Sequence, residues 1–352
     1  MYKKIMLGSA LLCSGLLCAQ NSDVEPETQS LSEVVIIDSR FDLKRQNSGK
    51  VVAKITEEEL AKTPGQTLPA VIGRISGIEI TGTRGNSGQN LGYYVRGGRN
   101  RQVVIMVDGI QMNDPSSIAS DFDLRLLPLS RVKSIEIIKG AASTLYGSGA
   151  ATAVIHIRTK DPADEKIAVQ LHSSVGTNRT SEDDYQPAEF HNAISVSGKL
   201  EDFQYQAGFN HRYSDNLSAV SLLSEDIPYE EDPFEKYNFH LKAGYEFTES
   251  LLMTVFGNYN EFSSDYDSYD FTDNANELLS DQMRIGSQVE YGYNNGSLKF
   301  TGSFSSLERK IESEFPNSFD SRQAAFDIYN KYRFGDRFYT VVGLNSILSS
   351  FN

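Results

Sequence analysis

Residues 91–114 read LGYYVRGGRNRQVVIMVDGIQMND, and this stretch decides how the first half of the chain is interpreted. The apolar run Val103–Val107 ends on the turn dipeptide Asp108-Gly109, a pattern that favours a short buried strand over a helix. Three cations precede the run, namely Arg96, Arg99 and Arg101. Because an unpaired charge is costly to bury, we expect these side chains to leave one end of a sheet toward water, phosphate or carboxylates.

The sequence around this strand, from about residue 31 to 160, mixes short strands with short helices. Thr56 and Glu59 are spaced as a capping box, which predicts that a helix begins there after the strand KVVAKI. A second helix is expected at 68–74, with Val71 and Ile72 facing inward. Further strands are expected at 77–81, 134–138 and 153–157. The first half is therefore predicted to be a compact α+β domain.

From residue 167 onward the pattern changes to a period of two. In the segment 203–213, aromatic and other apolar residues alternate with Gln, Asn and Arg, and the segment 237–247 repeats this alternation. Apolar side chains on one face and polar side chains on the other are typical of a transmembrane β-barrel, in which the polar face lines the lumen. A soluble β-sandwich, whose strands also alternate, is the alternative.

About nine such strands are expected, of about eleven residues each. Short turns are expected at 201–202, 248–250, 294–296 and 335–337, and polar loops of roughly fifteen to twenty residues on the other side. The strand centres are predicted near residues 171, 195, 208, 242, 256, 288, 302, 329 and 343. An odd number of antiparallel strands cannot close in the usual even-numbered pattern, so we expect this chain to be an N-terminal piece of a larger barrel.

The first nineteen residues have the features of an export signal: Lys3 and Lys4, an apolar stretch, and Ala19 as a small residue for cleavage. The alternative is lipidation at Cys18. Cleavage near Ala19 would remove Cys13 and Cys18, the only two cysteines, so the exported chain would have no disulfide. The net charge of −14 argues against nucleic acid as a partner.

At this point the residues resemble a known family. The stretch YYVRGGRNRQVVIMVDGIQMND and the later DLRLLPLSRVKSIEIIKGAASTLYGSGAATAVIHIRTK are similar to the plug domain of TonB-dependent outer-membrane receptors. Members of that family have a 22-stranded barrel with a plugged lumen. The resemblance implies four regions: a signal peptide at 1–19, a flexible segment at 20–44, a plug domain at 45–160, and the N-terminal part of a transmembrane β-barrel at 161–352.

The resemblance gives the cations of the plug a role. A plug inside a polar lumen can end in charged residues where barrel carboxylates such as Glu246 or Glu290 receive them. The predicted plug–barrel contacts are Arg96, Arg99, Arg101 and Lys139. Direct contact of these residues with a ligand is the alternative.

The segment LSEVVII at 31–37 lies where the receptor family has its TonB box, an extended segment that adds as a strand to a periplasmic energy-coupling protein. Strand addition needs a β-branched run with free backbone groups. The predicted box is Ser32, Glu33, Val34, Val35, Ile36 and Ile37. An ordinary first plug strand is the alternative.

Two loops of the second half are rich in acidic residues, YEEDPF at 229–234 and SSDYDSYDFTDNANELLSD at 263–281. Such dense oxygen donors suit calcium, although a solvated acidic loop has the same composition. The order of these features is similar to the vitamin B12 receptor group, in which acidic residues of two neighbouring loops bind calcium; Pro233 and Glu230 depart from that pattern. The candidate ligands are Glu230, Asp232, Asp265, Asp267 and Asp281.

No catalytic set is visible, since the five histidines are scattered and no nucleophile is paired with a base. The glycine-rich segment 140–149 lacks the spacing of a phosphate loop, and close backbone packing explains it better. We therefore expect an outer-membrane receptor of a Gram-negative bacterium for energy-coupled uptake of a scarce solute, preferably cobalamin. No cofactor is required in this interpretation. A siderophore or other metal chelate is the rival solute, and a passive barrel, an adhesin or a soluble exported enzyme are the other classes.

Overall fold

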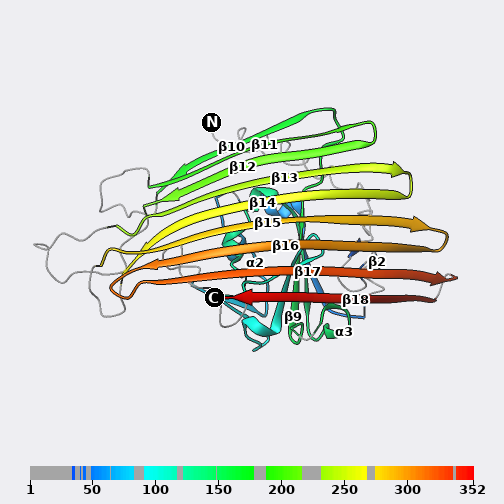
Figure 1. Ribbon diagram of the computed structural model, residues 1–352, viewed down its shortest axis with the longest axis horizontal. Helices are drawn as coiled ribbons and strands as arrows, with labels where there is room; N and C mark the ends of the chain where they lie inside the picture. Colours follow the sequence, from blue (N-terminus) through cyan, green and yellow to red (C-terminus); the bar gives the residue numbers. More distant parts are fainter. Residues whose placement is uncertain are drawn as a thin grey trace, which may run out of the picture. The chain divides into compact units, whose positions relative to one another are not determined.

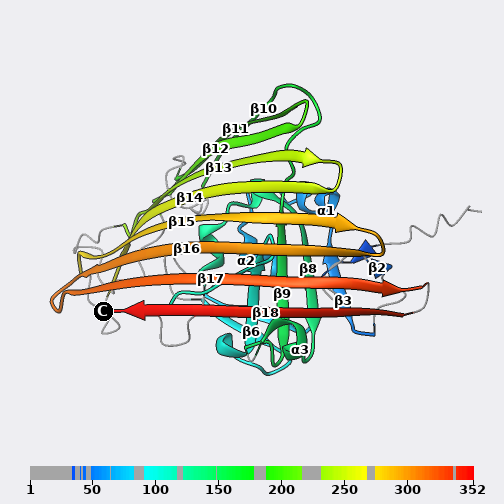
Figure 2. The same cartoon turned by 45° about the vertical axis from the view of Figure 1, so that its right-hand side comes forward.

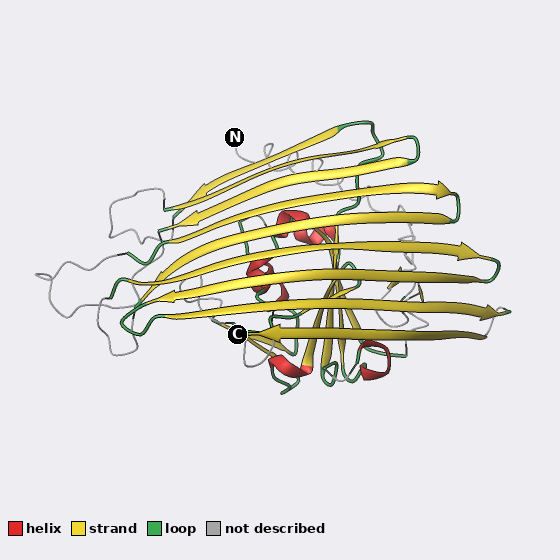
Figure 3. Ribbon diagram, viewed as in Figure 1, coloured by secondary structure: helices red, strands yellow, loops and turns green. Residues whose placement is uncertain are grey.

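Two sheets dominate the structure, a five-stranded sheet within the first half of the chain and a nine-stranded antiparallel sheet in the second half (Figures 1 and 3). The structure is a computed structural model. It describes residues 34–35, 40, 43–44, 49–63, 65–82, 91–116, 122–147, 149–177, 188–215, 231–267, 274–335 and 338–352. All of the elements below belong to one unit, Val34–Asn352.

The first sheet has the strand order β3-β8-β9-β6-β7, with β6 and β9 parallel and the other pairs antiparallel. Its strands are β3 (Val52–Ile55), β6 (Val103–Val107), β7 (Ile110–Met112), β8 (Val132–Lys139) and β9 (Ala153–Thr159). Two small sheets pair β1 (Val34–Val35) with β2 (Leu43–Lys44) and β4 (Ile78–Thr81) with β5 (Gly92–Val95). The helices are α1 (Glu57–Ala61), α2 (Leu68–Ile72), α3 (Ser143–Tyr146), and the 3-10 turns η2 (Asn100–Gln102), η3 (Leu124–Leu126) and η4 (Leu129–Arg131).

The local signals in the sequence explain these elements. Thr56 accepts from the backbone of Glu59, and the Glu59 carboxylate accepts from the Thr56 backbone at 2.7 Å, so the predicted capping box starts α1. Asp108 and Gly109 have φ angles of 50° and 84° and join β6 to β7 as a two-residue hairpin turn. The run VVIMV is a buried strand, as predicted, and the glycine-rich segment contains the one-turn helix α3.

The second sheet is a meander of nine strands in sequence order. Its strands are β10 (Ala168–Gly176), β11 (Glu189–Leu200), β12 (Phe203–Ser214), β13 (Phe234–Thr248), β14 (Leu251–Tyr266), β15 (Asn276–Tyr293), β16 (Gly296–Glu312), β17 (Asn317–Phe334) and β18 (Phe338–Phe351). The predicted number of strands and the positions of the short turns are confirmed. An α+β plug followed by an antiparallel barrel-type sheet is therefore the fold that the sequence predicted.

The strands are longer and the later loops shorter than predicted. The strands β15, β16 and β17 have 18, 17 and 18 residues instead of about eleven. The connection between β16 and β17 is only 313–316, because the antiparallel pairing continues to Ile311↔Asn317. Polar residues in these segments still alternate with a period of two, and they belong to strands, although composition suggested loop.

The two faces of the nine-stranded sheet differ as the alternation predicts. On β13 Phe239, Leu241 and Tyr245 are 48%, 64% and 45% exposed, whereas Lys236, Asn238 and His240, which occupy the alternate positions, are 4%, 1% and 5% exposed. The polar face is buried because the plug lies against it, as the contacts below show, and Figure 2 shows the five-stranded sheet on the same side. No helix within the described residues is long and apolar enough to cross a membrane.

Candidate functional site at the contact between the plug and the strands

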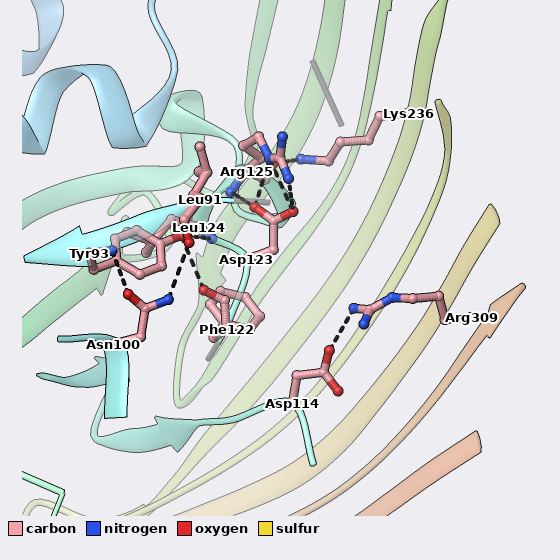
Figure 4. A network of polar contacts seen from close by, with 10 residues as sticks. All are labelled: Leu91, Tyr93, Asn100, Asp114, Phe122, Asp123, Leu124, Arg125, Lys236 and Arg309. Atoms are coloured by element: carbon pink, nitrogen blue, oxygen red, sulfur yellow. Dashed lines mark hydrogen bonds and ion pairs between the residues drawn. The ribbon is translucent and has the colours of Figure 1, made fainter. Parts of the chain in front are cut away.

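The first polar contact between the plug and the long strands is built on η3. Asp123 caps this turn and receives two hydrogen bonds from the Arg125 guanidinium, from Nε at 2.9 Å and from Nη2 at 2.7 Å. Lys236 of β13 donates from Nζ to the Arg125 carbonyl oxygen (Figure 4). Burial opposes the charge on Asp123, but the adjacent Arg125 guanidinium outweighs burial and lowers the pKa of the Asp123 carboxyl. The pair is therefore fully charged at neutral pH.

A second network organises the stretch that carries the RGGRN residues. The Tyr93 backbone N–H donates to Asn100 Oδ1 at 2.6 Å, and Asn100 Nδ2 donates to the Leu91 carbonyl oxygen at 3.2 Å (Figure 4). The Tyr93 hydroxyl donates to the Phe122 carbonyl oxygen at 3.3 Å and accepts from the Leu124 N–H at 3.2 Å. The strand β5 is thus fixed to η3, which places Asp123 and Arg125 against β13.

The turn residue Asp108 links three elements. Its carboxylate accepts from the Thr159 N–H at 2.8 Å and from the Thr159 hydroxyl at 2.6 Å, and its carbonyl oxygen accepts from Gln288 Nε2 of β15 at 2.5 Å. Burial tends to raise the pKa of Asp108, but Lys242 and the Thr159 donors outweigh burial, so that the pKa is lowered. The Asp108-Gly109 dipeptide therefore ends β6 and also binds the inner face of the long sheet.

Two ion pairs connect the plug and the segment before it to the later strands. Asp114 accepts from Arg309 of β16 at 2.6 Å and also from the Ser116 N–H at 2.9 Å (Figure 4). Arg40 pairs with Asp327 of β17, and both side chains are nearly buried. The Arg40 guanidinium also lies 4.8 Å from the ring centroid of Tyr146 and 5.2 Å from that of Tyr329.

Sequence reasoning missed these pairs because the partners lie 195 and 287 residues apart. The one available signal was the alternation of the strands, which puts both Arg309 and Asp327 on the inward polar face. It gave no information about which plug residue each would meet.

Of the four cations predicted to contact the barrel, two bind the plug itself and two are exposed. Arg96 donates to the Lys139 carbonyl oxygen at 2.9 Å, and Lys139 donates to the Ser76 carbonyl oxygen, so both bind the plug backbone. Arg99 and Arg101 are exposed. Arg96 and Lys139 donate to carbonyl oxygens of neighbouring plug segments. These hydrogen bonds take the place of the predicted ion pairs with barrel carboxylates.

The carboxylates proposed as partners are also paired elsewhere. Glu246 lies 2.7 Å from Lys199 and Glu290 lies 2.5 Å from Lys299, each on an adjacent or nearby strand of the long sheet. The expectation that these carboxylates receive the plug cations is therefore corrected: each pairs with a lysine of the same sheet, Glu290 with its cross-strand neighbour Lys299 and Glu246 with Lys199 two strands away.

Of the predicted TonB box, the structure describes Val34 and Val35. They form β1, which pairs antiparallel with β2 in the register Val34↔Lys44 and Val35↔Leu43. Ser32, Glu33, Ile36 and Ile37 lie outside the described residues. The described part of the box is extended, which is the conformation that strand addition requires.

The described members of the acidic set do not converge on one point. Asp265 and Asp281 lie on β14 and β15 at positions that alternate with the buried inward residues, and Asp281 accepts from the Tyr259 hydroxyl at 2.7 Å. Asp232 precedes β13 and is 1% exposed, while Asp267 accepts from the Asn274 N–H at 3.1 Å. Glu230 lies outside the described residues. Within the part of the chain that the structure describes, no group of three or more His, Cys, Asp or Glu residues fits a metal ion.

The comparisons with known proteins agree with this architecture. The family model "TonB-dependent Receptor Plug Domain" matches residues 44–154. The vitamin B12 transporter BtuB of Vibrio cholerae is 27% identical over 268 residues, which is 75% of this chain and 41% of that protein. BtuB of Photobacterium profundum is 25% identical over 297 residues, 84% of this chain and 45% of that protein. The chain thus spans less than half the length of these curated relatives.

Solved structures share the fold at lower identity. The siderophore receptor PirA from Acinetobacter baumannii has a TM-score of 0.67 at 18% identity and covers 85% of this chain and 48% of its own. FpvA of Pseudomonas aeruginosa bound to a heterologous pyoverdine has a TM-score of 0.68 at 14% identity. This match covers 90% of this chain and 44% of the FpvA chain. Residues 44–154 therefore match the plug domain of TonB-dependent receptors, and the chain as a whole resembles such a receptor in its similarity to the BtuB transporters and in its fold.

Proposed function

We propose that this protein is an outer-membrane receptor that takes up cobalamin by TonB-dependent transport. The observation that carries the transport part is the plug held against the polar face of a barrel-type sheet, with an extended β-branched segment at Val34–Val35 just before it. A strand of this kind can add to a periplasmic coupling protein, and force on it would act on a plug that closes the lumen.

Cobalamin is preferred because the BtuB relatives match along 75% to 84% of this chain, through the plug and into the long strands. The structural neighbours include the siderophore receptor PirA and the pyoverdine-bound FpvA, and they make a ferric siderophore the second candidate. Calcium binding by Asp265, Asp267, Asp281 and their neighbours stays a prediction of the sequence, to be tested together with the solute.

The test is equilibrium binding and uptake of labelled cobalamin by cells that express the receptor from its own gene. Binding to outer membranes is measured with calcium and with a chelator, and uptake is measured in TonB-positive and TonB-negative cells. We expect saturable binding in both strains and uptake only with TonB. Tight binding of a ferric siderophore with no cobalamin binding would assign the second candidate.

The coupling segment is tested by Val35→Pro. Proline removes a backbone N–H and fixes φ, so it should stop strand addition. We expect uptake to fall by about tenfold or more with binding retained, whereas Val35→Ile should behave as the unmodified receptor. Uptake that survives Val35→Pro would instead support a passive barrel.

A further inference from the structure

The plug is attached unevenly to the long sheet. The polar contacts between plug and strands that the structure describes fall on β13 and on β15 to β17. They are Lys236 to Arg125, Gln288 to Asp108, Arg284 to Met112, Arg309 to Asp114 and, just before the plug, Asp327 to Arg40. A plug that is fixed on this side has to move or loosen on another side if a large solute is to pass it.

Along β10 to β13 the plug and the strands are separated by two neighbouring cavities, of about 610 and 300 Å³. They share part of their lining, namely Gly65, Gln66, Leu129, His191 and Asn210. The smaller cavity reaches Gly176 and Phe234, where the long connections begin and end. The larger one reaches Gln170 and Lys160, near the other end of β10. Together they line β10 from Val169 to Gly176.

The strand side of the larger cavity has no Asp, Glu, Lys or Arg, and it mixes polar residues with the apolar Val169, Leu171, Ala193, Ile194 and Phe209. Strand alternation turns three imidazoles and several amides and hydroxyls toward the plug, namely His172, His191, His240, Gln170, Gln206, Asn210 and Ser195. His172 and His191 lie with ring centroids 5.0 Å apart, and Asn210 Nδ2 is 2.6 Å from His191 Nε2. Neutral hydrogen-bonding groups can contact a polar solute without holding it as strongly as fixed charges would.

His240 has hydrogen-bonding capacity that the described residues leave unused. Its side chain is 5% exposed, and neither ring nitrogen has a hydrogen-bond partner among the described residues. The ring lies across Gly208, where a Cβ would be 2.2 Å from His240 Cε1, so glycine is required for this placement. An unpartnered imidazole in a buried place is costly, which suggests that water or a passing solute contacts it.

We propose that the cavity between the plug and β10 to β13 is the route by which the solute passes the plug, with His191, Asn210 and His240 as contact residues along it. This inference rests on the proposed function, because it names the path of TonB-dependent transport. The plug would keep its contacts with β13 and with β15 to β17, and loosen on the β10 to β12 side.

The first experiment places a bulky side chain in the proposed route. Ala193 lines the larger cavity on β11, and Val196 on the same strand lies on the opposite face. We expect Ala193→Trp to reduce uptake by about tenfold or more while solute binding is kept, and Val196→Trp to leave uptake within about twofold. Residues 1–352 contain no tryptophan, so the difference in tryptophan emission between each variant and the unmodified receptor reports whether the variant is folded and where the introduced ring lies. Normal uptake by a folded Ala193→Trp variant would overturn the route.

The second experiment closes the route after folding and therefore does not depend on the tolerance of Ala193. Residues 19–352 contain no cysteine, so pairs introduced there into a receptor without other accessible cysteines can be crosslinked selectively with a short bis-maleimide. Gln66→Cys with Ser195→Cys spans the cavity, and Asp114→Cys with Arg309→Cys spans the fixed side. We expect only the first crosslink to stop uptake. Equal loss with both, or loss with the second alone, would overturn the route.

The same cells separate this inference from the proposed function. If the uncrosslinked receptor binds and takes up cobalamin only with TonB, the proposed function stands and the crosslinks test the route. If it shows no TonB-dependent uptake of cobalamin or of a ferric siderophore, the proposed function fails, and the route fails with it.

Discussion

Asp114 of the plug and Arg309 of β16 are 195 residues apart in sequence and form an ion pair with 2.6 Å between Oδ2 and Nη2. The Asp114 side chain is 4% exposed and the Arg309 side chain 22%. Because the carboxylate is the more buried partner, its pairing contributes more than a surface ion pair would. The pair is one of the contacts that hold the plug against the strands.

We predict that Arg309→Ala lowers the free energy of unfolding by about 1–3 kcal/mol, since it leaves a buried carboxylate with only the Ser116 donors. Asp114→Ala should cost less, because Arg309 can turn toward water. Denaturant titration of the detergent-solubilised receptor measures both, and the double variant completes the cycle. Additive effects of the two substitutions would mean that the pair contributes no coupling.

Asp108 is expected to make the free energy of unfolding of the plug fall at acid pH. Its folded-state pKa is lowered, so its contribution is fully present above the unfolded value of about 4 and is lost as the pH falls through the lower folded-state pKa. Asp108→Asn tolerates the positive φ and should be less stable at neutral pH, with a weaker loss below pH of about 4. Thermal unfolding at a series of pH values measures this. An unchanged acid profile in Asp108→Asn would contradict the assignment.

His156 of β9 is expected to make the free energy of unfolding depend on pH in a higher pH range than Asp108 does. It is 8% exposed, neither ring nitrogen has a hydrogen-bond partner within the described residues, and burial lowers its pKa to about 4. Asp108 opposes this shift, while Arg158, Lys299 and Arg40 add to it.

Because the unfolded chain binds this proton more readily, the free energy of unfolding should fall as the pH falls from about 6.5 toward the folded-state value. We predict that His156→Phe flattens the stability profile in this window, measured by the same thermal series. His172→Phe, at an exposed histidine, is the matched control and should leave the slope as it is. A slope that survives His156→Phe would assign it to another group.

Arg40 is expected to hold the segment before the plug through both its charge and its planar shape. It pairs with Asp327 and lies over the rings of Tyr146 and Tyr329. We predict that Arg40→Ala speeds protease cleavage before Lys50 by about tenfold, and that Arg40→Lys has an intermediate effect, because lysine keeps the charge without the stacking of the guanidinium. Cleavage is followed in intact outer membranes. Equal rates for all three proteins would show that Arg40 does not hold this segment.

The elements that the sequence predicted well depend on short-range patterns. The capping box at Thr56 and Glu59, the buried run Val103–Val107 and the turn Asp108-Gly109 are each specified within a few residues, and all three are present. The strand lengths were predicted less well, since polar residues at 313–320 look like a loop by composition, although β17 begins at Asn317.

The site was predicted less completely than the fold. The sequence singled out Arg96, Arg99, Arg101 and Lys139 because they cluster beside a buried strand, but Arg96 and Lys139 bind carbonyl oxygens of the plug. The residues that join the plug to the strands are scattered singly, and each looks ordinary in its own segment. Among them are Asp114, Arg309, Arg40 and Asp327.

By itself, the sequence determined the two kinds of architecture, since a period of two with one apolar face specifies long half-buried strands and a mixed pattern specifies an α+β plug. It also determined which face of each strand is polar. Only the tertiary structure decided which inward side chain meets which plug residue, and on which side of the plug the cavities lie. The physical reason is that such contacts join residues hundreds of positions apart, and their geometry depends on how the sheet curves around the plug.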